Sequence, residues 1–94
     1  MTERFEWDGA KARANARRHS VSFAEAVTVF DDPLAALVGD PDHSQDEERR
    51  LLIGYSTRQR LLVVTYTERG GAIRVIGARR ATRTERRAYE DAQE

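Results

Sequence analysis

The sequence has no cysteine, only one lysine, two prolines and seven aromatic residues. Without cysteine the chain can form neither a disulfide nor a thiolate metal site. No apolar run approaches the roughly 20 residues that a membrane-spanning helix needs. The first residues, MTERFEWDGAK, lack the apolar core of a signal peptide. These absences favour a cytoplasmic protein.

The 94 residues predict a single domain, residues 1–94. A chain of this length buries about two-thirds of its unfolded surface, which is enough for one modest core.

The net charge of zero conceals a strong segregation. Residues 31–48 hold seven acidic residues and no lysine or arginine. Residues 49–87 hold eleven arginines against Glu68 and Glu85, a net charge of +9. Because a guanidinium can grip a phosphate with two hydrogen bonds, this half can present a positive surface to a polyanion. The alternative is internal neutralisation, which the two glutamates and the acidic loop can provide for only some of the arginines.

Three helices are expected. The first runs from about Asp8, a plausible N-cap, to His19, with alanines at alternate positions. Ser22 and Glu25 have the spacing of a capping box that opens a short amphipathic helix, which Asp31-Asp32-Pro33 ends. A second capping box, Thr82 to Glu85, opens a C-terminal helix that reaches about Ala92. This last helix has few apolar residues and must dock on the sheet or on a partner.

Four strands are expected at 34–38, 49–56, 60–68 and 73–76, the last two joined by a turn at Gly70-Gly71. A two-residue turn would pair Glu68 with Ile73. One face of the hairpin then carries Leu62, Val64, Tyr66, Glu68, Ile73, Val75, Gly77 and Arg79. The other carries Leu61, Val63, Thr65, Thr67, Arg74, Ile76, Ala78 and Arg80. A longer loop would shift this register.

The short connections between these strands require an antiparallel meander. The predicted fold class is therefore α+β, with two N-terminal helices, a four-stranded antiparallel sheet and a C-terminal helix.

Cleavage of RNA without a metal needs a group to accept the 2′-hydroxyl proton, cations for the charge on phosphorus, and an acid for the leaving oxygen. The candidates for proton transfer are Glu68, His19, Tyr66 and Tyr89, and the candidate phosphate clamps are Arg69, Arg74, Arg79, Arg80 and Arg83. Spacing alone does not select among them. His43 lies among aspartates in the 40–46 loop, but one nitrogen ligand makes a solvated loop the favoured interpretation over a metal site. No metal and no cofactor are expected.

The chain resembles the BrnT family of type II toxins, the toxin partners of ribbon-helix-helix antitoxins. The resemblance rests on five collinear segments that cover most of the chain: FEWDGAKARANARRHSVSFAEA, VFDDP, DPDHS, TERG and RVIGARRATRTERRAYE. It implies a fold like that of the RelE-like ribonuclease toxins, cleavage of RNA that inhibits translation, and neutralisation by an antitoxin. It also suggests a 2:2 complex that binds promoter DNA through the antitoxin.

Carried onto this sequence, the resemblance implies catalytic residues in the TERG and ARRAT segments and, by position only, in the last helix. They are Glu68, Arg69, Arg79, Arg80 and Tyr89. Phosphate contacts are assigned to Lys11, Arg58, Arg74 and Arg83. In this hypothesis, arginines at the end of the last strand hold the scissile phosphate while Glu68 or a nearby group assists attack by the 2′-hydroxyl.

Two alternatives remain. A non-catalytic RNA- or DNA-binding module would use the same positive half to bind phosphates without cleaving them. A protein-interaction module would use its sheet edge and thin C-terminal helix to receive a partner chain and would have no affinity for nucleic acid.

Overall fold

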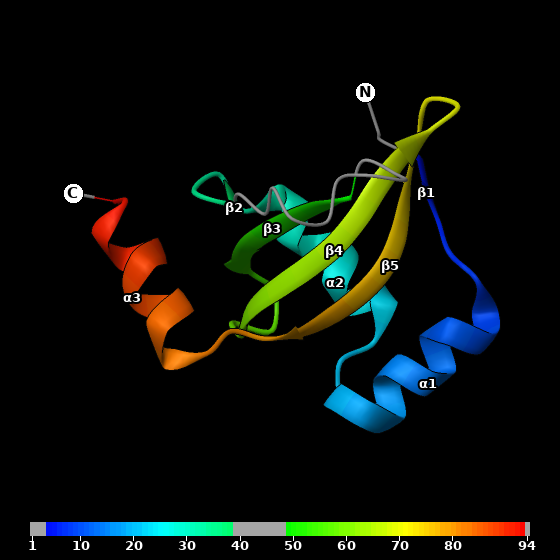
Figure 1. Ribbon diagram of the computed structural model, residues 1–94, viewed down its shortest axis with the longest axis horizontal. Helices are drawn as coiled ribbons and strands as arrows, with labels where there is room; N and C mark the ends of the chain where they lie inside the picture. Colours follow the sequence, from blue (N-terminus) through cyan, green and yellow to red (C-terminus); the bar gives the residue numbers. More distant parts are fainter. Residues whose placement is uncertain (1–3, 39–48, 94) are drawn as a thin grey trace.

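The computed structural model describes residues 4–38 and 49–93 (Figure 1). The predicted loop at 40–46, with His43, lies outside these residues. The helices and strands follow in the order β1 (Arg4–Glu6), α1 (Gly9–His19), α2 (Phe23–Val27), the 3-10 helix η1 (Thr28–Asp31), β2 (Ala36–Val38), β3 (Arg50–Tyr55), β4 (Leu61–Arg69), β5 (Ala72–Arg80) and α3 (Arg83–Asp91). None of the described helices combines the length and apolarity needed to cross a membrane.

The described strands form one five-stranded sheet in the order β1-β5-β4-β3-β2. Strands β2 to β5 form the predicted antiparallel meander. The expectation of four strands was wrong, because β1 adds a fifth strand parallel to β5, with Arg4 beside Ala72 and Glu6 beside Arg74. Strand β1 has only three residues, and Phe5 is its one apolar side chain, so it is too short to show a strand periodicity in the sequence.

The larger core lies between the sheet and the segment from α1 to η1. It contains Val21, Phe23, Ala26 and Val29 from the helical side and Leu52, Leu62, Val64, Tyr66, Ile73, Val75 and Ala78 from the sheet. A smaller cluster on the other face joins Tyr89 of α3 to Ile53, Leu61 and Val63. The last helix therefore docks on the sheet through one large side chain, that of Tyr89. Figure 1 shows where α3 lies relative to the strands.

The β4–β5 hairpin has the predicted turn. Gly70 and Gly71 have φ angles of 59° and 79°, which glycine adopts without steric cost. Glu68 pairs with Ile73 as expected. The predicted faces hold only as far as Val75.

A bulge in β5 reverses the predicted faces beyond this point. Tyr66 pairs with Val75, but its neighbour Thr65 pairs with Gly77, so Ile76 is an extra residue in β5. Because side chains alternate between faces, one extra residue sends every later side chain to the opposite side. Ala78 consequently joins the larger core.

The same bulge places Arg79 beside Val63, on the face that carries α3. The prediction that Arg79 shares a face with Leu62 and Val64 was therefore wrong, because the pattern of the sequence contains no sign of the extra residue.

Candidate active site

The predicted site residues divide between two ends of the sheet. Glu68 and Arg69 adjoin the β4–β5 turn, whereas Arg79 and Arg80 end β5. Ala72 and Arg79 are seven residues apart in β5, which at about 3.3 Å per residue separates the ends by roughly 20 Å. Figure 1 shows the turn and the start of α3 at opposite extremes of the hairpin. Of the two possibilities in the hypothesis, Glu68 or a nearby group, this distance favours a group nearer to Arg79 and Arg80.

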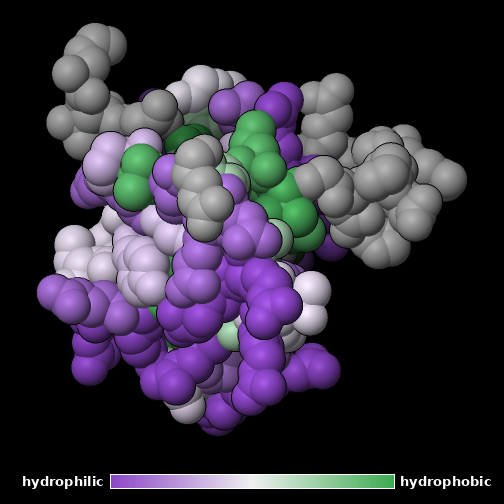
Figure 2. Space-filling model, turned by 90° about the vertical axis from the view of Figure 1, so that its left-hand side faces the viewer, coloured by the Kyte–Doolittle hydropathy of each residue, from purple (hydrophilic) through white to green (hydrophobic). Residues whose placement is uncertain are grey.

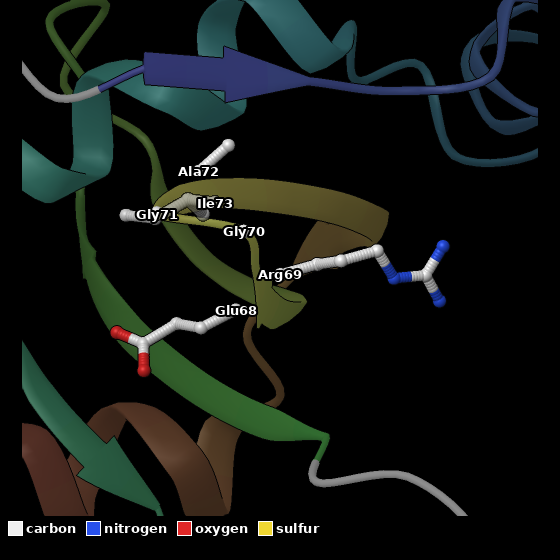
Figure 3. A pocket seen from close by; sticks show the side chains of 6 residues that line it. All are labelled: Glu68, Arg69, Gly70, Gly71, Ala72 and Ile73. Carbon is white, nitrogen blue, oxygen red and sulfur yellow. The ribbon is translucent and has the colours of Figure 1, made fainter.

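The turn itself offers only a shallow hollow. It is lined by six consecutive residues, from Glu68 to Ile73. The side chains of Glu68 and Arg69 point to opposite sides of it (Figure 3), as neighbours in a strand do. The lining comes from the ends of β4 and β5 and the turn between them, and its one acid and one cation point apart, so they do not converge on one phosphate here.

The other end gathers five arginines within nine residues. They are Arg79, Arg80, Arg83, Arg86 and Arg87. Arg58 lies at the same end, in the turn that leads into Leu61 of β4, and Leu61 accepts a backbone hydrogen bond from Ala81. Four of the predicted cations, Arg58, Arg79, Arg80 and Arg83, thus lie at this end of the sheet. Lys11 lies on α1, which covers the opposite face of the sheet from α3 (Figure 1).

Arg79 is bound to the first turn of α3. Its Nη1 and Nη2 donate to the two carboxylate oxygens of Glu85 at 2.8 Å and 2.9 Å. Glu85 also accepts from the backbone N–H of Thr82, which completes the predicted capping box. Chiefly because of the hydrogen bond from Arg79, the pKa of Glu85 falls to about 2. Glu85 is therefore ionised at neutral pH and is a weak base.

Arg86 reaches the sheet from the residue next to Glu85. Its Nη1 donates to the hydroxyl of Tyr55 at 3.1 Å. Tyr55 is half-buried at the end of β3, with its ring edge-on to Tyr89 at 5.6 Å. Sequence reasoning missed Tyr55, because it ends the apolar run of β3, where it reads as one more core position, and no motif marks it.

Tyr55 and Arg79 lie on the same face of the sheet. Tyr55 pairs with Leu61 of β4, and Arg79 pairs with Val63 two residues further along. From strand spacing and rise, their Cα atoms are roughly 12 Å apart, so both side chains can reach one phosphate group between them.

Tyr89, a predicted catalytic residue, is buried and committed to another contact. Its hydroxyl donates to Oδ2 of Asp32 at 2.9 Å. Burial and the Asp32 carboxylate raise the pKa of Tyr89 to about 12. Asp32 also accepts from the backbone N–H of Tyr55 and of Leu34, and these donors outweigh burial and hold the pKa of Asp32 below its ordinary value. The structure therefore gives Tyr89 a packing role.

A buried ion pair supports the turn before β4. Glu25 accepts from Nε of Arg60 at 2.9 Å and from Ser56 Oγ at 2.7 Å. The hydrogen bond from Arg60 is the main reason that the pKa of Glu25 is lowered. Glu25 is thus diverted from the predicted capping box, of which only the Ser22 half forms. Arg58, in contrast, has a side chain that is 72% exposed and lies 3.9 Å from Glu25.

The remaining candidates are placed as follows. Arg74 pairs with Glu6 at 3.3 Å. Tyr66 is buried against Phe30, and His19 is half-buried in the last turn of α1. Within the described residues, Arg80, Arg83 and Arg87 are exposed and have no carboxylate partner.

The side of the molecule that carries α3 has a hydrophilic area and an apolar area. Figure 2 shows hydrophilic side chains over the lower part of this side and apolar atoms gathered in its upper part. The large exposed apolar residues include Leu34, Leu37 and Val38, in and beside the edge strand β2. Across the described residues, no group of three or more His, Asp and Glu side chains is arranged to hold a metal ion.

The Arg79–Glu85 pair predicts a pH dependence of stability. The pKa of Glu85 is depressed in the folded state, from 4.5 to about 2. The contribution of Glu85 to the free energy of unfolding is therefore complete above about pH 4.5 and is lost as the pH falls toward 2. Between pH 7 and pH 3, the free energy of unfolding in urea should fall more for the wild type than for Glu85→Gln. Glu90→Gln removes an exposed carboxylate from the same helix and should behave like the wild type. Equal pH dependence in all three chains would contradict this assignment.

Comparisons with known proteins agree with this fold. The family model described as "Ribonuclease toxin, BrnT, of type II toxin-antitoxin system" matches residues 7–85. The crystal structure of the Brucella abortus ribonuclease toxin BrnT is similar to this chain with a TM-score of 0.67 and 22% sequence identity. The match covers 87% of this chain and 100% of that one. No curated protein sequence matches.

The family model spans strands β2 to β5, the helices α1 and α2 packed on them and the first turn of α3, up to Glu85. It thus includes Tyr55, Arg79 and the turn that carries Arg58. The chain belongs to the BrnT family of ribonuclease toxins of type II toxin–antitoxin systems.

Proposed function

We propose that this chain cleaves RNA at the end of the sheet where β5 passes into α3. The observation that carries the proposal is the set of exposed arginines at this end without carboxylate partners in the described chain, Arg80, Arg83 and Arg87, together with the Tyr55 hydroxyl that Arg86 binds from α3. Arginine suits this role because its planar fork of donors matches the oxygens of a phosphate.

The arginines divide into two kinds in this proposal. Arg79 and Arg86 are anchored, by Glu85 and Tyr55 respectively. Arg86 holds a fixed positive charge at the site, whereas the charge of Arg79 is balanced by the Glu85 carboxylate and the ion pair fixes the start of α3. Arg80 and Arg83 are exposed and can close on the RNA backbone, and so can Arg58, whose exposed side chain lies 3.9 Å from Glu25. Fixed donors stabilise the charge that develops on phosphorus because they need no reorganisation during the reaction.

Tyr55 is the proton donor in this proposal. Its oxygen already accepts a hydrogen bond from Arg86, so its own O–H is directed elsewhere. The 2′-hydroxyl oxygen of the RNA attacks phosphorus, and its proton passes to water. The bond from phosphorus to the 5′-oxygen breaks, and Tyr55 protonates that oxygen. The products are a 2′,3′-cyclic phosphate and a 5′-hydroxyl, and Tyr55 regains its proton from water.

The proposed reaction requires no metal ion, because arginines neutralise the charge on phosphorus and a side chain supplies the proton. The cleavage assays below therefore contain EDTA. Activity that appears only on addition of Mg²⁺ would contradict metal independence.

The first prediction separates the two ends of the hairpin. Arg80→Ala combined with Arg83→Ala should lower RNA cleavage by about 10²-fold, because two phosphate donors are lost. Glu68→Ala combined with Arg69→Ala removes one acid and one cation roughly 20 Å away along the strand. It should retain cleavage. Cleavage is measured on purified protein and, in bacteria, as growth arrest with fragmentation of total RNA.

Three outcomes of this experiment bear on the proposal. Loss of cleavage only in the Glu68, Arg69 double variant would move the site to the turn. Salt-sensitive RNA binding by the wild type with the RNA left intact would favour a non-catalytic binding module. The absence of both binding and cleavage would favour a protein-interaction module.

The second prediction concerns the two edge-on tyrosines. Tyr55→Phe keeps the ring and removes the hydroxyl, so cleavage should fall by about 10²-fold or more while RNA binding is retained. Tyr89→Phe removes the hydroxyl bound to Asp32 and should lower the free energy of unfolding with little effect on cleavage by the folded protein. Full activity of Tyr55→Phe would exclude Tyr55 as the acid.

We also propose that the antitoxin implied by the family is a small ribbon-helix-helix protein that forms a 2:2 complex with this chain and carries promoter DNA. This proposal rests on the family resemblance. The exposed apolar side chains around β2 supply area for a protein partner. Co-expression with such a protein from a neighbouring reading frame should relieve growth arrest. Light scattering of the purified complex should give the mass of two copies of each chain, and any other ratio would contradict the stoichiometry.

A further inference from the structure

The outer edge of β5 is only partly covered by β1. Strand β1 pairs with Ala72, Ile73 and Arg74 and then ends. Strand β5 continues for six more residues to Arg80. Along this stretch the backbone N–H and C=O groups on the outer edge have no partner strand in the described sheet, and buried groups of this kind need one.

The side chain of Asn15, in α1, takes the place of the missing strand. Its Oδ1 accepts from the backbone N–H of Ala78 at 3.1 Å, and its Nδ2 donates to the backbone C=O of Ala78 at 2.8 Å. A side-chain amide has the donor and the acceptor of a peptide group, so this pair of hydrogen bonds imitates one rung of a β-ladder. The same Nδ2 also donates to the C=O of Val21 at 2.9 Å and so joins α1, the start of α2 and β5.

Asn15 acts at a sensitive place in β5. Ala78 lies two residues after Ile76, the extra residue of the bulge, and directly before Arg79. A slip of the strand by one residue would reverse the faces of Arg79 and Arg80. Fixing both backbone groups of Ala78 therefore fixes Arg79 toward Glu85 and α3, and fixes Arg80 away from them.

We infer that Asn15 is a positioning residue for the RNA-cleaving site, which holds the bulged end of β5 in the register that presents Arg79 to α3; this rests on the function proposed above. Asn15 lies on α1, on the opposite face of the sheet from Tyr55 and α3, and acts on the reaction only through the backbone of Ala78. Its contact with Val21 adds an ordinary structural role, so a useful test must separate stability from position.

The test compares two substitutions of Asn15 with a control substitution that lowers stability elsewhere in the fold. Asn15→Ala removes all three hydrogen bonds. Asn15→Asp keeps the shape and the acceptor for the Ala78 N–H but turns a carboxylate oxygen toward two carbonyl oxygens. Phe5→Leu trims the ring that packs against Phe30 at 5.1 Å and so lowers stability at the other end of β5. All three are assayed for kcat and KM on one RNA, with the folded fraction of each measured.

Both Asn15 variants should lower kcat per folded molecule by about tenfold or more, because a displacement near 1 Å in an active site has effects of this size. KM should change by less than about threefold, since the exposed arginines that bind RNA remain. Phe5→Leu should lose stability but keep both constants. Combining Asn15→Ala with Arg79→Ala should cost less than the product of the two separate losses, because both changes remove the same arrangement. A wild-type kcat in folded Asn15→Ala would overturn the inference. So would a double variant whose loss of kcat equals the product of the losses of Asn15→Ala and Arg79→Ala.

A second measurement does not depend on activity. In NMR hydrogen exchange, the Ala78 amide should exchange at least about tenfold faster in Asn15→Ala, and the Arg79 Nε–H signal should shift. Phe5→Leu should leave both unchanged. If the wild type cleaves no RNA, the proposed function fails, whereas the register held by Asn15 is still decided here. Unchanged exchange at Ala78 with an unchanged Arg79 signal would show that Asn15 does not hold the register.

Discussion

The arrangement of the proposed site depends on one carboxylate, that of Asp32, at the end of η1. It accepts hydrogen bonds from the backbone of β3, from the backbone of Leu34 and from the hydroxyl of Tyr89. Helix α3 has few apolar side chains, and Tyr89 is its one buried residue. Without Asp32, a tyrosine hydroxyl would be buried beside the sheet with no acceptor, at a cost of about 1–3 kcal/mol. The carboxylate therefore fixes the position of α3, and through it the positions of Arg86 and Glu85. Gly54 makes room for this contact, since a Cβ there would lie 3.0 Å from the Asp32 carboxylate.

The distribution of arginines shows how a neutral chain can keep a positive site. Arg60, Arg74 and Arg79 are paired with Glu25, Glu6 and Glu85, respectively, and hold elements together. These pairs neutralise three arginines through glutamates outside the acidic 40–46 loop, which is not among the described residues. The exposed arginines at the junction of β5 and α3 are among those that remain for a polyanion. Since composition counts both kinds alike, the sequence could not sort them.

Much of the fold was predictable because it follows from local patterns. The caps at Asp8, Ser22 and Thr82, the glycine turn and the runs of apolar and β-branched residues in β3 and β4 each act over a few residues. The features that the sequence did not predict depend on contacts between distant parts of the chain. Strand β1 forms only because β5 offers an edge, and the bulge at Ile76 has no signature in the alternation of side chains. The site followed the same division: the arginines stand in a recognisable segment, whereas Tyr55 and Asn15 gain their roles from contacts with distant elements.

The parallel pairing of β1 with β5 joins residues that are 68 positions apart, as in the contact of Glu6 with Arg74. Every other strand pair in the described sheet joins neighbours in the chain. Because closing a long loop costs entropy before it is compensated by contacts, this pair should form late in folding. On the ribosome, β1 is made first and must wait until β5 has emerged. Until then the Phe5 side of the core stays open, and an incomplete chain holds its N-terminal segment unpaired.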